Sequence, residues 1–206
     1  MYLTAEVRWF EKGSIPPAMM NWFTQIHPRV WTAAEQTNYY YSLPNDDAIG
    51  IKLRQNRIEI KKRQAVEKSV RFTPLVTGAI ETWEKWSVAL CPVEINFDEI
   101  DTDAIWVGVH KRRNLQRYRL TELLAPIPVA YRRRVPQGFS LELSQITVRH
   151  KDWWTIAFEF YGIEKIKRNE IKDIIGKIFT SVPDLRLTSN SSYGYPQFLN
   201  RHIINL

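Results

Sequence analysis

The sequence is poor in the residues that build metal cages, disulfides and nucleophilic active sites. Cys91 is the single cysteine, which excludes an internal disulfide and a cysteine-based zinc site and is compatible with a reducing compartment. The four histidines show no metal-ligand spacing, and neither a glycine-rich phosphate loop nor a Gly-x-Ser-x-Gly motif is present. No apolar run approaches the about 18 residues of a membrane span. The first residues also lack the charged and apolar regions of a signal peptide, so we predict a cytoplasmic protein without a membrane partner.

The totals describe a basic globular chain. At 206 residues with 44% apolar content, the sequence is suited to one domain, which we expect to span residues 1–206. The net charge is +7 and the pI is about 9.5. This balance favours anionic partners, such as phosphates or nucleic acid, without choosing between them.

Several short segments alternate between apolar and polar residues. The segment Leu3–Phe10 places its apolar side chains on one face and Thr4, Glu6 and Arg8 on the other. Two later segments repeat the pattern, Ile49–Arg54 with Lys52 and Arg54, and Arg57–Arg63 with Glu59, Lys61 and Arg63. Side chains of a strand point alternately to its two faces. Many such segments, with both signs of charge, therefore indicate a barrel with an ionic lumen.

The rest of the chain predicts more strands and two helices. Apolar residues at helical spacing predict helices at Ala18–Ile26 and Glu164–Phe179, and the second of these is amphipathic. The further strands are expected at Asn38–Ser42, Val70–Val76, Ala79–Leu90, Trp106–Lys111, Val129–Arg134, Phe139–Val148 and Trp153–Gly162. This pattern favours an α+β fold, with a mostly antiparallel β-barrel and flanking helices that include a C-terminal amphipathic helix.

The predicted ionic faces carry more bases than acids. The bases are Arg8, Lys52, Arg54, Lys61, Arg63, Arg132 and Arg134, and the acids are Glu6, Glu59, Glu142 and Glu159. Arginine forks and lysine ammonium groups suit phosphate oxygens, so such a lumen would bind a polyanion. Carboxylates in the same cavity would hold a Mg²⁺ or Mn²⁺ ion that bridges to the phosphate. The competing interpretation places each charged pair on the solvated outer face of an open sheet.

The order of these motifs resembles a known family. The motifs are Thr4–Phe10, Tyr39–Asp46, Ile51–Arg54, Ile58–Arg63, Tyr131–Arg134, Leu141–Ile146, Ile156–Phe160, the C-terminal helix and Ser192–Tyr193. In this order they resemble the CYTH superfamily, the triphosphate tunnel metalloenzymes. That family includes thiamine triphosphatases, class IV adenylate cyclases, inorganic triphosphatases and tunnel-type RNA triphosphatases. The resemblance covers nearly the whole chain.

The resemblance implies a triphosphatase that uses Mg²⁺ or Mn²⁺. It makes Glu6 and Glu159 catalytic residues and Glu6, Glu142 and Glu159 metal ligands. It implies phosphate binding by Arg8, Lys52, Arg54, Lys61, Arg63, Lys111, Arg113, Arg132 and Arg134. Either Lys111 and Arg113 or Arg132 and Arg134 would fill one basic strand, and the sequence leaves both open. The expected partners are a triphosphate-containing small molecule or an RNA 5′ end, and a homodimer, since family members commonly pair.

Three positions depart from the family pattern. Thr4 and Ala157 stand where the family has glutamates, and Ser144 stands where some members have aspartate. A hard cation needs several oxygen ligands, so a thinner carboxylate set weakens metal binding. The alternative function is therefore a catalytically impaired module that binds phosphate, nucleotide or RNA in the same tunnel. A third interpretation is a basic scaffold that binds RNA from its outer surface, with Trp106–Arg113 as the contact patch.

Overall fold

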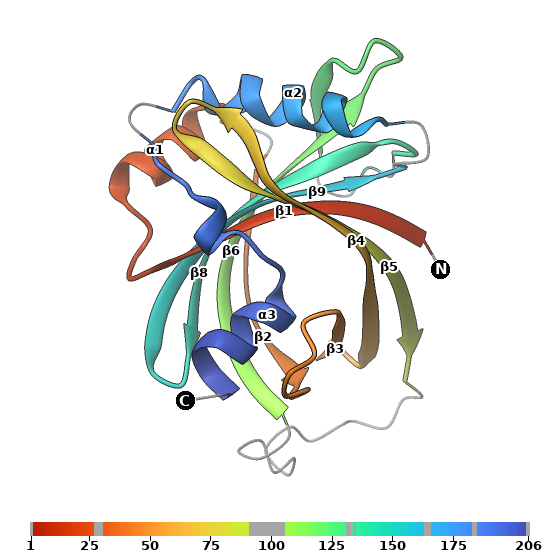
Figure 1. The fold of residues 1–206 in the computed structure, drawn as a ribbon, viewed down its shortest axis with the longest axis vertical. Helices are drawn as coiled ribbons and strands as arrows, with labels where there is room; N and C mark the ends of the chain where they lie inside the picture. The colour runs from red at the N-terminus through yellow and green to blue at the C-terminus, as the bar shows by residue number, and fades with distance from the viewer. Residues whose placement is uncertain are drawn as a thin grey trace.

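A computed structural model of the chain shows a closed antiparallel β-barrel (Figure 1). It describes residues 2–26, 31–90, 106–130, 133, 135–162, 166–182 and 185–204. Eight strands follow one another around the wall in the order β2-β3-β4-β5-β1-β9-β8-β6, and β6 pairs back with β2. The α+β fold with an antiparallel barrel and flanking helices, expected from the sequence, is confirmed.

The strands of the wall differ widely in length. Their bounds are β1 Tyr2–Lys12, β2 Thr32–Tyr41, β3 Ile49–Arg54, β4 Arg57–Thr73, β5 Val76–Ala89, β6 Trp106–Leu120, β8 Gly138–Val148 and β9 Lys151–Tyr161. A short ninth strand, β7 (Pro126–Val129), pairs with the end of β6 and lies at the sheet edge. Its two prolines are tolerated there because an edge strand does not need every N–H for pairing.

The outer face of β1 lies in the larger hydrophobic core. Ala5, Val7 and Trp9 pack with side chains of α1 (Pro17–Ile26) and α2 (Arg168–Phe179). The Trp9 indole ring meets an α2 ring edge-on, with 5.7 Å between the centroids of Trp9 and Phe179. The helices thus cover the outside of the barrel (Figure 1) and leave the opposite face of β1 to the lumen.

The amphipathic helix begins later than its apolar period suggested. It starts at Arg168, because Glu170 accepts the Lys167 backbone N–H at 2.6 Å and thereby caps the first turn. Residues 163–165, at the start of the predicted helix, lie outside the described residues. Gly176 brings the helix close to β4, since a Cβ there would lie 2.8 Å from the Phe72 carbonyl oxygen. None of the helices in the described ranges has the length and apolar character needed to cross a membrane.

The C-terminal segment completes the wall and then enters the barrel. β1 pairs with β5 from Tyr2 to Glu6, and beyond that point residues 187–193 run between the two strands. Leu187 bridges to β5, and the Tyr193 N–H donates to the Arg8 carbonyl of β1 at 3.1 Å.

Two short helical turns follow this segment. α3 (Tyr195–Leu199) packs against inward-facing residues in a second core, where the Phe10 and Phe198 rings stack with centroids 4.2 Å apart. Residues 200–204 form the last helical turn. The helical tail therefore fills part of the barrel interior.

Two predicted strands are corrected by the structure. Val70–Val76 spans a hairpin, because β4 continues to Thr73 and β5 starts at Val76 after a two-residue turn. In the predicted strand Val129–Arg134, β7 ends at Val129, Ala130 and Arg133 are not in a strand, and residues 131, 132 and 134 lie outside the described residues. β2 and β6 are longer than predicted because cross-strand pairing extends through polar stretches that lack an apolar alternation.

Candidate functional site: an ionic cavity in the barrel

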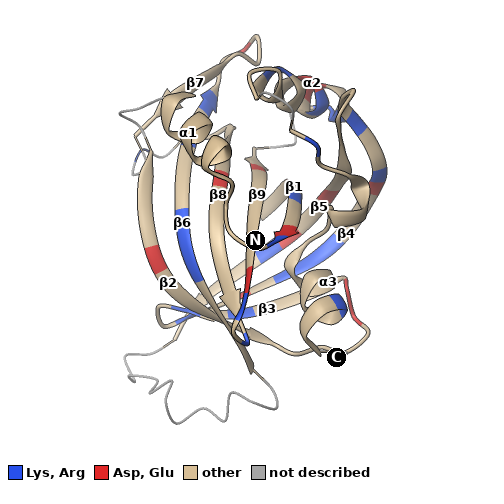
Figure 2. Cartoon of the chain, turned by 90° about the vertical axis from the view of Figure 1, so that its left-hand side faces the viewer, with Lys and Arg blue, Asp and Glu red and all other residues tan. Residues whose placement is uncertain are grey.

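The inner wall of the barrel encloses a cavity of about 450 Å³. Nine bases and four acids line it: Arg8, Lys52, Arg54, Arg57, Lys61, Lys85, Lys111, Arg113 and Arg117, with Glu6, Glu59, Glu142 and Glu159. The charged positions occur along strands on several sides of the wall (Figure 2). The lining has an excess of five formal positive charges, so the cavity attracts anions.

Most of the predicted site residues meet in this cavity. The lining includes Glu6, Arg8, Lys52, Arg54, Lys61, Lys111, Arg113, Glu142 and Glu159, so the interpretation that placed these charges on a solvated outer face is wrong. Arg63 instead pairs with Glu81, at 2.8 Å between Nη1 and Oε1, and does not line the cavity. Arg132 and Arg134 lie outside the described residues. Lys111 and Arg113, from one of the two candidate basic strands, line the cavity.

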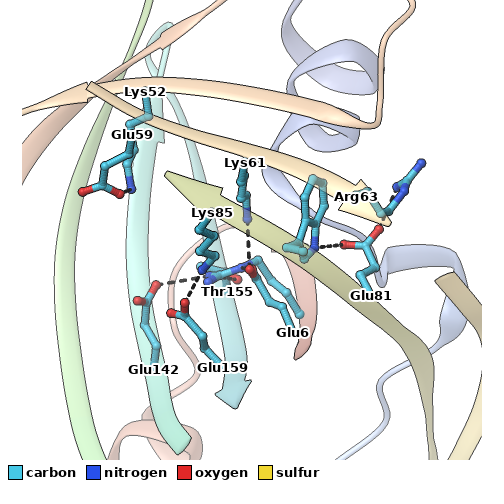
Figure 3. Close-up of polar contacts among 12 residues, drawn as sticks. Glu6, Lys52, Glu59, Lys61, Arg63, Glu81, Lys85, Glu142, Thr155 and Glu159 are labelled. Carbon is cyan, nitrogen blue, oxygen red and sulfur yellow. Dashed lines mark hydrogen bonds and ion pairs between the residues drawn. The ribbon is translucent and has the colours of Figure 1, made fainter. Parts of the chain in front are cut away.

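Glu6 and Arg8, from β1, lie at the centre of the cavity's ion pairs. Arg8 Nε donates to Glu6 Oε1 at 2.7 Å, and Arg8 Nη1 donates to Glu142 Oε1 and Thr155 Oγ1, both at 3.2 Å. Lys61 Nζ donates to the second Glu6 oxygen at 2.9 Å (Figure 3). Burial alone would raise the pKa of Glu6, but Lys61 and Arg8 outweigh it and hold that pKa well below its usual range.

Glu159 lies directly across from Glu6 in the pairing of β1 with β9. Its carboxylate accepts a hydrogen bond from Lys85 Nζ, which reaches it from β5 (Figure 3). Glu142 on β8 has a second basic neighbour besides Arg8, since its Oε2 lies 3.7 Å from Arg113 Nε. The three carboxylates predicted to bind metal are thus each paired with lysine or arginine.

These carboxylates do not form a cation site in the structure. Among the described residues there is no group of three or more acidic, histidine or cysteine side chains suited to a metal ion. Thr4 and Ala157 contribute no carboxylate, and both Glu6 oxygens already accept hydrogen bonds from Arg8 and Lys61. Mg²⁺ and Mn²⁺ need several free oxygen ligands, so the residues present do not fit the implied metal.

A second ion-pair cluster joins β3 to β4. Glu59 accepts from Lys52 at 2.7 Å and from Arg54 at 2.5 Å. Burial lowers the pKa of Lys52 to about 8, although the Glu59 carboxylate opposes this. Burial would raise the pKa of Glu59, but Lys52 and Arg54 outweigh it and lower that pKa to about 2.

Three polar groups of the lining lack such partners. Lys111 is 5% exposed, has no ion pair within the described part of the chain, and places its Nζ 3.9 Å from the centroid of the Tyr195 ring. The hydroxyls of Tyr195 and Thr4 are buried and find no hydrogen-bond partner among the described residues. Burial lowers the pKa of Lys111 well below its usual range, against the opposing charge of Glu142. These three groups could therefore donate hydrogen bonds to a bound anion.

Lys85 and Tyr195 are site residues that the sequence analysis missed. Lys85 lies in a segment predicted as a strand, and its even spacing from Glu81 marks both as residues of one face. This spacing is the sequence signal that could have assigned Lys85 to the inner face of its strand. Tyr195 lies on a five-residue helix, too short for a periodic pattern to reveal.

Comparison with known proteins finds no relative of the chain. No protein-family model matches the chain, and no curated protein is significantly similar to it. The closed barrel agrees with the tunnel architecture expected from the order of the motifs. The cavity must therefore be interpreted from its own residues.

Proposed function

We propose that the cavity binds the phosphate chain of a triphosphate-bearing anion. The excess of bases over acids in its lining supports this, since arginine and lysine donate charged hydrogen bonds to phosphate oxygens. A volume of about 450 Å³ lies within the range of small-molecule sites. The charged part of the anion, whether a small molecule or an RNA 5′ end, would occupy the lumen.

One observation carries this proposal: Lys111 is buried without a carboxylate partner in the described residues. An ammonium group buried in this way costs several kcal/mol unless a partner compensates it. Arg8, Lys52 and Arg113 repel the Lys111 ammonium and lower its pKa, while Glu142, which already pairs with Arg8 and Arg113, opposes them. A polyanion placed among them relieves that repulsion.

The unpartnered hydroxyls support the same location. Buried polar atoms in native proteins nearly always have a hydrogen-bond partner, and exceptions often mark a missing ligand or water. Tyr195 and Thr4 both line the cavity and both have such an orphaned hydroxyl. Phosphate oxygens accept hydrogen bonds from hydroxyl donors, so the same anion would satisfy Lys111 and these two side chains.

Metal-dependent hydrolysis of the triphosphate is the second candidate. It is favoured by the location of Glu6, Glu142 and Glu159 around one cavity. Their pairing with bases, and the non-acidic Thr4 and Ala157, favour binding without hydrolysis instead. We therefore propose a tunnel that binds the phosphate chain without hydrolysing it.

An outer RNA-binding patch is less well supported by the same strand. The basic segment Trp106–Arg113 directs Lys111 and Arg113 into the cavity, so these two charges are withdrawn from the outer surface. Steep salt dependence with no effect of lumen substitutions would support the outer patch.

Calorimetry with inorganic tripolyphosphate in EDTA tests the binding proposal. Wild-type protein is expected to bind one tripolyphosphate per chain. Lys111→Met is expected to weaken the binding, whereas Arg168→Ala, which removes a 57% exposed side chain on α2, leaves it unchanged. Absence of binding by well-folded wild type contradicts the proposal. Phosphate release from tripolyphosphate or ATP with Mg²⁺ or Mn²⁺ would instead establish the hydrolase.

A further inference from the structure

Glu6 and Glu159 form a like-charged pair across two neighbouring strands. They are opposite each other in the register of β1 with β9, and both line the cavity. Like charges directly opposite destabilise a sheet unless a cation lies between or beside them. A hard divalent cation, which takes carboxylate oxygens as ligands, is one group that could lie between them.

In this chain a lysine occupies that position. Lys85 comes from β5, on the far side of β1 from β9, and its Nζ donates to Glu159 Oε1. Its charge also interacts with Glu6. Figure 3 shows Lys85 directed toward Glu159, with Glu6 and Lys61 close by. The Lys85 side chain is 15% exposed, so it is held inside the cavity and not on the rim.

We propose that the Lys85 ammonium is a built-in cation that replaces a divalent metal ion beside Glu6 and Glu159. This inference rests on the proposed function, because the ammonium would then face the bound phosphate chain. An ammonium group has three N–H donors, and Glu159 takes one of them. The remaining donors are available to phosphate oxygens. The tunnel binds its anion without metal for this reason.

The small number of free carboxylates in the cavity favours a singly charged ammonium group over a divalent ion. Thr4 and Ala157 contribute no carboxylate beside Glu6 and Glu159, and Arg8 and Lys61 already neutralise Glu6. A divalent ion would add positive charge to a cavity whose lining already has an excess of five bases. A lysine adds one charge and is held by the strand, so its position does not depend on metal supply.

Titration of the ligand-free protein with Mn²⁺, followed by electron paramagnetic resonance, tests this assignment directly. Wild type is expected to lack a tight Mn²⁺ site. Lys85→Met frees the carboxylate of Glu159, which lies opposite Glu6, and is expected to bind Mn²⁺ at least about tenfold more tightly. Lys62→Met is the matched control, because Lys62 lies on β4 and is exposed to solvent. It should behave as wild type.

Tripolyphosphate binding gives the second readout. Wild type should bind equally well, within about twofold, in EDTA and in Mn²⁺, and Lys85→Met should lose about tenfold in EDTA and recover it in Mn²⁺. The inference is overturned when Lys85→Met binds Mn²⁺ no better than wild type, or when wild type needs Mn²⁺ for tripolyphosphate. Lys85→Gln provides the same test should Lys85→Met fail to fold. Wild type that binds no tripolyphosphate refutes the proposed function, and the Mn²⁺ titration still decides the role of Lys85.

Discussion

Two sets of polar groups in the cavity differ in whether they have partners. Around Glu6, each of the predicted metal-binding carboxylates has a lysine or arginine partner, and these pairs hold one another in place. In the second set, the ammonium group of Lys111 and the hydroxyls of Tyr195 and Thr4 are buried without such partners in the described residues. The first group supports the barrel wall. The second group lowers the stability of the protein, and a bound anion would compensate this loss.

Removal of Arg8 should have the largest effect on stability. Arg8→Met leaves Glu6 and Glu142 buried with one partner fewer, which costs about 3–5 kcal/mol of the free energy of unfolding. Urea denaturation measures this loss. Arg168→Ala breaks an exposed ion pair with Glu67 and should cost less than about 1 kcal/mol. Equal losses for the two variants would show that the ion pairs of Arg8 do not stabilise the fold.

Removal of Lys111 should have the opposite effect on stability. Lys111→Met replaces a buried, unpaired ammonium with an apolar side chain of similar length, so the melting temperature should rise. Affinity for tripolyphosphate should fall by about 10- to 100-fold, because a charged hydrogen bond is lost. A thermal melt and calorimetry on the same sample measure both. A destabilised variant would mean that partners in the folded protein stabilise the Lys111 ammonium.

The pH dependence of tripolyphosphate binding tests whether Lys52 contacts the anion. The pKa of Lys52 is lowered to about 8, so Lys52 is charged below that pH and loses its proton above it, beside Glu59, Arg54 and Lys61. A bound anion favours the ammonium form, so affinity weakens as pH rises. The ratio of wild-type to Lys52→Met affinity should fall about tenfold between about pH 7 and about pH 9. A constant ratio in calorimetry across this range would remove Lys52 from the site.

The smallest effect is expected from a single hydroxyl. Tyr195→Phe removes an oxygen that has no hydrogen-bond partner in the described structure, so stability should not decrease. Affinity for tripolyphosphate should fall by about 2- to 10-fold, the range of one neutral hydrogen bond. The same calorimetric assay detects this change. An unchanged affinity would place the anion away from α3.

The inner faces of β1, β3 and β4 could be predicted from the sequence because they depend on neighbours two residues apart. Glu6, Arg8, Lys52 and Lys61 line the cavity as their alternation required. The role of Lys85 could not be predicted in this way, since its side chain reaches past β1 to Glu159. That contact depends on the order of strands in the wall.

The limits of the strands were harder to predict for a related reason. Apolar residues continue from Val70 through the turn to Val76, so hydrophobicity does not mark the hairpin between β4 and β5. The closure of the barrel pairs Thr32 with Leu115, a contact that no local pattern encodes. Tyr195 reaches the cavity because the tail enters the barrel, which is likewise a property of the whole fold.

Residues 187–193 also determine when the barrel wall can close during folding. They lie between β1 and β5, so part of the edge of β1 is covered only by residues that come much later in the sequence. Exposed strand edges of a nascent chain are prone to aggregation, and contacts between distant residues form slowly. Closure of the wall beside β1 is therefore expected to be a slow, long-range step of folding.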